Sequence, residues 1–177
     1  MKKQIEIFNR TLTWIRTNAL DGKGICVTSK IPKIYPEVTG YYIPSLLQWG
    51  ERNLAISFAK NLINIQKPDG SWYDPDDVAP YIFDTAQILK GLVAVQTILP
   101  GAKESIIKGC DWIISRMTDE GRLVTPSQGA WGNDETFCSE LIHLYCLTPL
   151  VDAGNLFGRE DYIEAANKIK EYYYFGK

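Results

Sequence analysis

The sequence lacks the residues and motifs that several large protein classes require. It contains one histidine in 177 residues, so a single chain cannot supply the histidine pair of a carboxylate-bridged di-iron site. The glycine-rich signatures of P-loop and Rossmann proteins and the G-x-S-x-G elbow of α/β-hydrolases are also missing. The chemistry of these three fold families therefore has no support.

Charge and hydropathy exclude two kinds of partner. The net charge is -2 and no run of Lys or Arg occurs, so we expect no nucleic-acid partner. No apolar stretch approaches the roughly 20 residues of a membrane span. The first ten residues, MKKQIEIFNR, contain no apolar signal region. We expect a cytoplasmic protein with small, buried cysteines, because no C-x-x-C spacing occurs among Cys26, Cys110, Cys138 and Cys146.

One pattern recurs three times, with a period of about fifty residues. The segments WIRTNALDGKGI, LINIQKPDGSW and WIISRMTDEGRL each place an acid-glycine turn after an apolar pair. Their glycines are Gly22, Gly70 and Gly121. Glycine suits a left-handed backbone position because it has no Cβ to clash. The pattern predicts a repeated helical unit whose helices end in such turns.

Two types of helix alternate along the chain. Segments around 43–49, 85–99 and 137–151 are apolar on nearly all sides, which is typical of buried helices. The other type has a single apolar stripe with spacings of three and four. The four stripes are Ile5, Phe8, Leu12, Ile15; Leu54, Phe58, Leu62, Ile65; Ile106, Cys110, Ile113, Met117; and Tyr162, Ala166, Ile169, Tyr173.

This alternation predicts an all-α fold. We expect one domain over 1–177, a two-layer array of helical hairpins with about seven helices. The long connections, roughly 19–43, 67–83 and 118–135, then emerge together where the inner helices begin. Long loops on a rigid scaffold commonly carry function, so this end is the predicted site.

The Q-x-x-x-G-x-W turn of Gln66, Gly70 and Trp72 resembles the QW motif of triterpene cyclases. Together with the alternating helices, it resembles the α/α-toroid superfamily of terpenoid cyclases and protein prenyltransferases. The segments YPEVTGYYIPSLL, PYIFDTAQILKGL and SELIHLYCLTPL are similar to the N-terminal part of bacterial toroid proteins associated with surface-polysaccharide or lipopolysaccharide biosynthesis. The resemblance implies a toroid fold and a glycan context, and no particular reaction.

About seven helices make an incomplete ring. The uncovered flanks of such a half ring expose apolar surface, which usually marks an interface. We therefore expect either a homodimer or a missing C-terminal half of the toroid.

Two carboxylates lead the catalytic candidates. Glu37 lies between tyrosines in IYPEVTGYY, in an expected loop with no helix end for it to cap. Asp84 begins the segment DTAQ, which has the form of a capping box with Gln87. An N-cap residue at the mouth of a cavity can also present its second carboxylate oxygen to a ligand. Asn133 and Asp134 allow the same cap argument.

The literal DPDD at 74–77 has the D-x-D-D pattern of the protonating acid in class II terpene cyclases. In that family the motif runs directly into Thr-Ala. Here Thr-Ala follows Asp84, and Tyr81 and Phe83 occupy the other two acid positions. We therefore interpret DPDD as a solvated turn around a proline.

Glu140 and His143 lie three residues apart and share a face of an expected inner helix. They are candidates for ligand contact or proton transfer, and a satisfied buried hydrogen bond within the bundle is an equal alternative. Cys138 lies five residues from His143, which puts the two on different faces. We expect no metal and no cofactor.

Aromatic rings beside carboxylates suit a sugar, or a carbocation held by cation–π attraction. Our first hypothesis is a glycan-related protein in which Glu37 and Asp84 form an acid/base pair of a hydrolase, lyase or epimerase. The alternatives are a terpenoid-cyclase-like or prenyltransferase-like enzyme or its relic, and a non-catalytic binding module. The expected ligand contacts are Tyr35, Tyr41, Tyr42, Trp72, Tyr81, Trp131 and Asp134, with Glu135 beside them.

Overall fold

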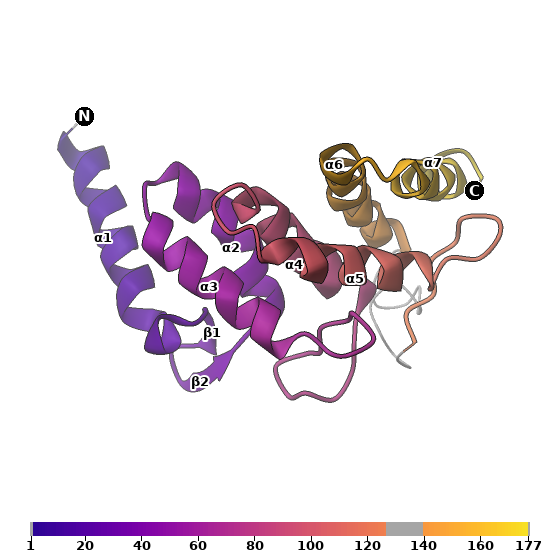
Figure 1. The fold of residues 1–177 in the computed structure, drawn as a ribbon. Coiled ribbons are helices and arrows are strands. Elements are labelled where there is room, and N and C mark those ends of the chain that lie inside the picture. The colour runs from indigo at the N-terminus through magenta and orange to yellow at the C-terminus, as the bar shows by residue number, and fades with distance from the viewer. Residues whose placement is uncertain (1, 127–139, 177) are drawn as a thin grey trace.

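The computed structural model describes residues 2–126 and 140–176, and within them the chain is mostly helical (Figure 1). A small antiparallel hairpin of two strands joins the first two helices. The α-helices are α1 (Lys2–Asn18), α2 (Pro36–Gln48), α3 (Arg52–Ile65), α4 (Ile82–Val95), α5 (Ala102–Ile114), α6 (Leu147–Phe157) and α7 (Glu160–Phe175). The short elements are η1 (Leu20–Gly22) and η2 (Glu140–Cys146), both 3₁₀-helices, and strands β1 (Cys26–Thr28) and β2 (Ile31–Ile34).

The helices pack as two rows of neighbours. Helix α2 packs against α4, and α4 packs against η2 and α6, which makes one row. Helices α3, α5 and α7 follow each other in the second row, each also contacting the first. Helix α1 lies at the edge of this array (Figure 1). None of the described helices is both long enough and apolar enough to cross a membrane.

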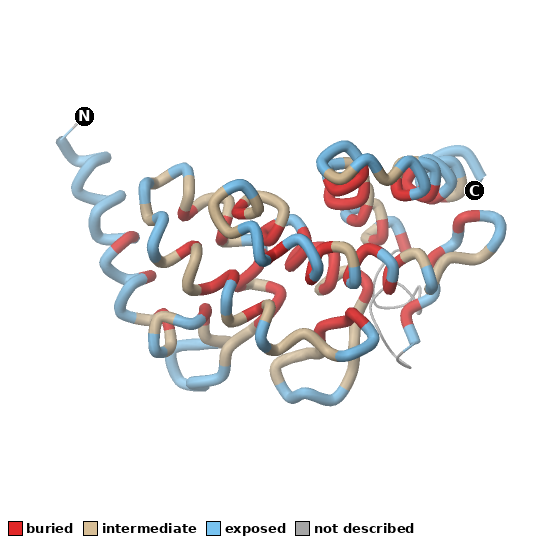
Figure 2. The backbone as a smooth tube through the Cα atoms, in the orientation of Figure 1, coloured by how far each residue is buried: buried red, intermediate tan, exposed pale blue. Residues whose placement is uncertain are grey.

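Burial confirms the two expected helix types (Figure 2). Helix α4 buries nine of its residues, which cover most of its circumference. Helix α7 buries the whole predicted stripe of Tyr162, Ala166, Ile169 and Tyr173 and leaves its opposite side exposed. A helix surrounded by others must be apolar on every side, whereas an outer helix needs a single stripe.

Several expectations were wrong in detail. Ile5 and Phe8 are exposed, so only the second half of the α1 stripe, Leu12 and Ile15, reaches the core. The first connection contains the β1–β2 hairpin, which no pattern indicated. The third inner segment is a 3₁₀-helix before it becomes α6 at Leu147, so its α-helix begins later than expected.

The predicted glycine turns all have left-handed backbone, with φ of +68° at Gly22, +96° at Gly70 and +97° at Gly121. The helices themselves end several residues earlier, at Asn18, Ile65 and Ile114. Because a Cβ at Gly70 would lie 2.3 Å from the Lys108 carbonyl oxygen, and one at Gly121 would lie 2.4 Å from that of Lys168, these turns pack directly on the next outer helix. Glycine is therefore required at both positions for φ and for space.

Gln66 fastens the second turn to α5. Its Nε2 donates to the carbonyl oxygens of Gly70 and Ser105 at 2.9 Å each, and its Oε1 accepts from the Ser105 hydroxyl at 2.7 Å. Trp72 is fully buried, and its Nε1 donates to the Leu62 carbonyl at 2.7 Å. The Gln-Gly-Trp motif therefore links two successive outer helices, α3 and α5.

The crossing of α2 and α4 depends on two glycines. A Cβ at Gly91 would lie 2.2 Å from the Gly40 carbonyl oxygen, and one at Gly40 would lie 2.5 Å from Cα of Ile88. Gly40 was expected to shape a loop, but it lies inside α2. Because no side chain separates the two backbones, the N-terminal ends of α2 and α4 are held close together.

We predict that Gly91→Ala destabilises the protein by about 1–3 kcal/mol, because the added methyl group meets backbone that cannot rotate away. Gly101→Ala is the matched control, since a Cβ there meets nothing within 4 Å and its φ is -62°. Its free energy of unfolding should stay within about 0.5 kcal/mol of the parent. Urea unfolding measures both, and equal losses would contradict the proposed close crossing.

Candidate functional site

The start of α2 carries Glu37, which is buried on the side of the pocket that α4 also lines. Tyr35 is the N-cap, with extended backbone, and Pro36 takes the first helical position that proline favours. The Thr39 hydroxyl donates to the Tyr35 carbonyl at 2.7 Å and accepts from the Ile25 amide at 3.0 Å, which ties the hairpin to the helix. Glu37 thus lies in the first turn of α2, and its expected loop position was wrong.

Asp84 occupies the corresponding first turn of α4. The N-cap is Tyr81, and no side chain caps this helix end. The expected capping box of Asp84 with Gln87 was therefore wrong, because the helix begins two residues before Asp84. The Asp84 carboxylate therefore does not cap the helix and is available to a ligand.

A pocket of about 410 Å³ lies between these two helix starts. This volume falls in the range of small-molecule sites. Five of the predicted site residues line it together, and Val38, Asp74 and Phe83 complete the wall. The five are Tyr35, Glu37, Tyr41, Tyr81 and Asp84.

Both carboxyl groups are hard to ionise in this pocket. Glu37 is 7% exposed, and burial raises its pKa from 4.5 to about 7. Burial likewise raises the pKa of Asp84 from 3.8 to about 7, and the neighbouring charges of Glu37 and Asp74 add to the rise. Burial raises the pKa of Tyr35 to about 12, and the neighbouring charges of Asp84, Glu37 and Asp74 add to the rise. Within the described residues neither Glu37 nor Asp84 has a cationic partner or a hydrogen bond to its carboxylate.

Asp74 was expected only as part of a solvated turn, and it also lines the pocket. Its carboxylate accepts from the backbone amides of Asp76, Val78 and Ala79 at 2.9–3.1 Å. Asp76 and Asp77 are exposed and pair with lysines, as the turn interpretation predicted. The sequence signal for Asp74 is its position between the Gln-Gly-Trp turn and the start of an inner helix.

Two of the predicted aromatic contacts lie outside this pocket. Trp72 is completely buried beneath the second turn, so its role as a sugar platform was wrong. Tyr42 is not among the lining residues and packs edge-on against Trp49, with ring centroids 6.4 Å apart. Consecutive residues of a helix point about 100° apart, so only Tyr41 of this pair faces the pocket.

Glu140 and His143 form a separate buried cluster on η2. Glu140 is ion-paired with Arg122, and the His143 ring lies 5.9 Å from that of Tyr173. Burial lowers the pKa of His143 to about 4, so the imidazole is neutral at pH 7. Neither ring nitrogen has a hydrogen-bond partner among the described residues. The structure does not bring Glu140 or His143 into the pocket, and the neutral ring does not support their expected role in proton transfer near pH 7.

Trp131, Asn133, Asp134 and Glu135, together with Cys138, lie outside the described residues. Within the described ranges no group of three or more His, Cys, Asp or Glu side chains could hold a metal ion. What the arrangement offers chemically is two protonatable carboxyl groups facing tyrosine hydroxyls and rings. Such groups can exchange a proton with a bound ligand near neutral pH.

The chain was compared with protein-family models, curated proteins and solved structures, and none of them matches it.

We predict that Glu37→Gln stabilises the protein more at pH 8 than at pH 5. The folded pKa of about 7 exceeds the unfolded value of 4.5. The folded state therefore keeps a proton that the unfolded chain loses, and its stability falls as the pH rises from 4.5 to 7. The glutamine side chain does not titrate, so the variant avoids this loss of stability. Its gain in unfolding free energy over the parent should be about 2 kcal/mol larger at pH 8 than at pH 5.

Urea unfolding at pH 5 and pH 8, followed by tryptophan fluorescence, measures this difference. Asp76→Asn is the control, because Asp76 is exposed and outside the pocket, so its effect should not change between the two pH values. The same change in unfolding free energy for Glu37→Gln at both pH values would show that this carboxyl is already ionised.

Proposed function

We propose that the protein binds a glycan in the pocket between α2 and α4 and acts on it by acid/base chemistry. One observation carries this proposal: two enclosed carboxyl groups, with no partner for either carboxylate in the described residues, face one pocket walled by three tyrosines. Sugar hydroxyls would donate to the carboxylates, and the apolar faces of a sugar ring would stack on the phenol rings.

The two carboxyl groups would take different roles. Glu37 and Asp84 repel each other equally when both are ionised, and the charge of Asp74 adds a further repulsion for Asp84. When one proton is shared, Asp84 therefore keeps it and acts as the general acid, and ionised Glu37 acts as the base. In a hydrolase, Asp84 would protonate the leaving oxygen while Glu37 takes a proton from water. In an epimerase or lyase, Glu37 would take the proton from carbon.

The tyrosines would form the sugar-binding wall. The Tyr41 ring is 40% exposed and lies beside the pocket mouth, where a ring face can be covered by a ligand without moving the helix. Tyr35 and Tyr81 flank the two helix starts and keep their hydroxyl protons at neutral pH, because burial raises the pKa of both. They can therefore donate hydrogen bonds to sugar oxygens.

Two observations separate this proposal from its alternatives. Carbocation chemistry needs a dry, apolar pocket and a strong acid, whereas three carboxyl groups and three phenols line this one. A purely structural role would use both carboxylates on backbone amides, yet of the three acids that line the pocket only Asp74 has amide partners among the described residues. The glycan proposal accounts for both observations.

The resemblance to bacterial toroid proteins supports a wider context. We propose that the two rows of helices are part of an (α/α) toroid, and that the protein acts in the cytoplasm in surface-polysaccharide or lipopolysaccharide metabolism. The row order of α2, α4 and α6, covered by α3, α5 and α7, fits a segment of such a ring.

The test is binding and turnover of oligosaccharides built from neutral, N-acetylated and uronic-acid sugars. Calorimetry should find a ligand that Glu37→Gln and Asp84→Asn each bind about tenfold or more weakly, because each loses a hydrogen bond between a carboxyl group and the sugar. Any turnover should have a bell-shaped pH profile centred near pH 7, where one proton is shared by the pair.

Asp76→Asn again serves as the control, and its affinity should equal that of the parent. Tyr41→Ala should weaken binding through lost stacking while leaving the pH profile in place. Unchanged affinity in both carboxyl variants, with folding intact by circular dichroism, would rule out this pocket as the glycan site.

A further inference from the structure

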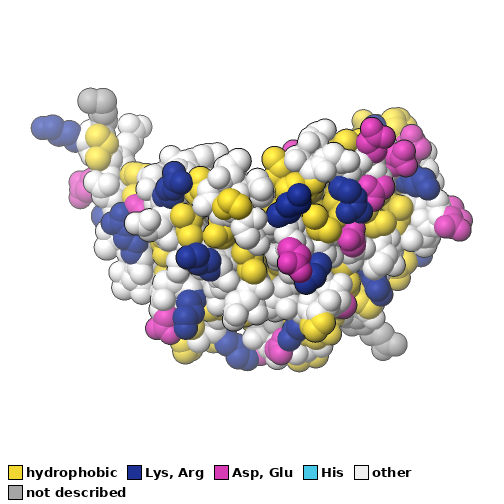
Figure 3. Space-filling model, in the orientation of Figure 1, with side chains coloured by type: hydrophobic (Ala, Val, Ile, Leu, Met, Phe, Trp, Pro, Cys, Tyr) yellow, Lys and Arg dark blue, Asp and Glu magenta, His cyan; other side chains and the backbone are white. Residues whose placement is uncertain are grey.

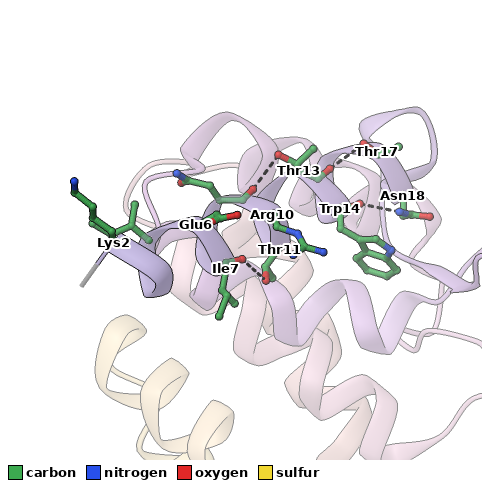
Figure 4. Close-up of a pocket in the computed structure, with 11 residues that line it drawn as sticks. Lys2, Glu6, Ile7, Arg10, Thr11, Thr13, Trp14, Thr17 and Asn18 are labelled. Carbon is green, nitrogen blue, oxygen red and sulfur yellow. Dashed lines mark hydrogen bonds between the residues drawn. The ribbon is translucent and has the colours of Figure 1, made fainter.

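Helix α1 presents an apolar face that the rest of the chain leaves uncovered. Ile7 is 55% exposed and Trp14 is 53% exposed, and the two lie on one side of the helix, two turns apart (Figure 4). An open space of about 1040 Å³ lies along α1, and every described residue that lines it belongs to α1 itself. No other element of the described chain lines this space.

The core holds α1 mainly through its C-terminal half. Leu12 and Ile15 are its buried residues, and the Phe8 ring meets Trp49 edge-on at 5.9 Å. Arg16 forms an ion pair with Glu51. An outer helix so weakly held needs a further partner to cover Ile7 and Trp14, because exposed apolar stripes of this kind usually mark an interface.

The far end of the molecule presents a complementary surface. On α7 the residues Glu164, Lys168, Glu171 and Phe175 fall on one stripe, opposite the buried one. The Phe175 side chain is 70% exposed, and the neighbouring Tyr174 is 72% exposed and packs against it. Large exposed rings therefore lie beside carboxylates on α7, as large exposed apolar side chains lie beside cations on α1.

The two end helices carry opposite charge. Helix α1 contains four basic residues and one acid, whereas α7 contains four acids and two basic residues. In the described part of the chain, Lys3 and Arg10 on α1 and Glu164 and Glu171 on α7 form no ion pair. Figure 3 shows basic side chains at the α1 end and a concentration of acidic ones over α6 and α7.

We infer that α1 of one copy of this chain packs against α7 of a second copy, in a head-to-tail contact. Ile7 and Trp14 pack against Tyr174 and Phe175, while the basic residues of α1 face the acids of α7. A second copy is the occupant because each end supplies the surface that the other end lacks. Contact between two α1 helices would instead bring like charges together, which costs free energy at an interface.

This contact uses different surfaces on the two copies, so it is heterologous. Its apolar part supplies affinity, and its charges set the orientation. Raising the salt concentration should therefore weaken the association, because the exposed charges are screened. The inference is independent of the glycan pocket, since none of its residues lines that pocket.

Charge reversal tests the contact. Lys3→Glu with Arg10→Glu places acids on α1, and Glu164→Lys with Glu171→Lys places bases on α7. Sedimentation velocity at micromolar concentration should show an associated parent, and each double variant alone should dissociate about tenfold or more readily. A 1:1 mixture of the two variants should associate again, because every α1–α7 contact between them pairs opposite charges.

The control is Lys60→Glu with Lys90→Glu, which changes the net charge as the α1 variant does, at exposed positions outside both end helices. It should associate like the parent. Circular dichroism checks folding, and one chain that combines both reversals should regain association. A monomeric parent, or an associated parent whose α1 and α7 variants dissociate alike but fail to recombine in the mixture, would overturn the inference.

Discussion

The close crossing of α2 and α4 is the constraint on which the site depends. Gly40 and Gly91 let the two backbones meet without intervening side chains, and interiors packed at this density transmit a change in one helix directly to the other. The crossing brings two helix starts together, one carrying Glu37 and the other Asp84. A larger residue at either glycine would separate these starts and widen the pocket between them.

The pocket differs from the other polar clusters in how its charges are satisfied. Arg122 pairs with buried Glu140, and backbone amides satisfy Asp74. Those groups stabilise the fold around them. Glu37 and Asp84 instead have their pKa values raised by burial, which costs stability at neutral pH. Buried groups that destabilise their own fold are typical of functional sites.

The array also has two unequal ends. The inner row is covered on one side by α3, α5 and α7, while α1 is attached mainly through Leu12 and Ile15. Every internal helix hairpin buries its apolar stripe on a neighbour, but an end helix has a neighbour on one side alone. Exposed large side chains therefore gather on α1 and at the C-terminal end of α7, and this follows from the geometry of any open array of hairpins.

The sequence by itself determined the helix types, the repeated turns and the pair of carboxylates. The apolar periodicity indicates which positions are buried, and the glycines at positions 70 and 121 indicate left-handed backbone. These are local properties, so one segment is enough to reveal them.

Only the tertiary structure decided which of these groups meet. It buried Trp72 away from the pocket, placed Asp74 in its wall, and set Glu140 beside Arg122 on a 3₁₀-helix. It also turned Gly40 from an expected loop residue into a helix-crossing contact. Each of these outcomes depends on a neighbour distant along the chain, and a pattern within one segment carries no information about such a neighbour.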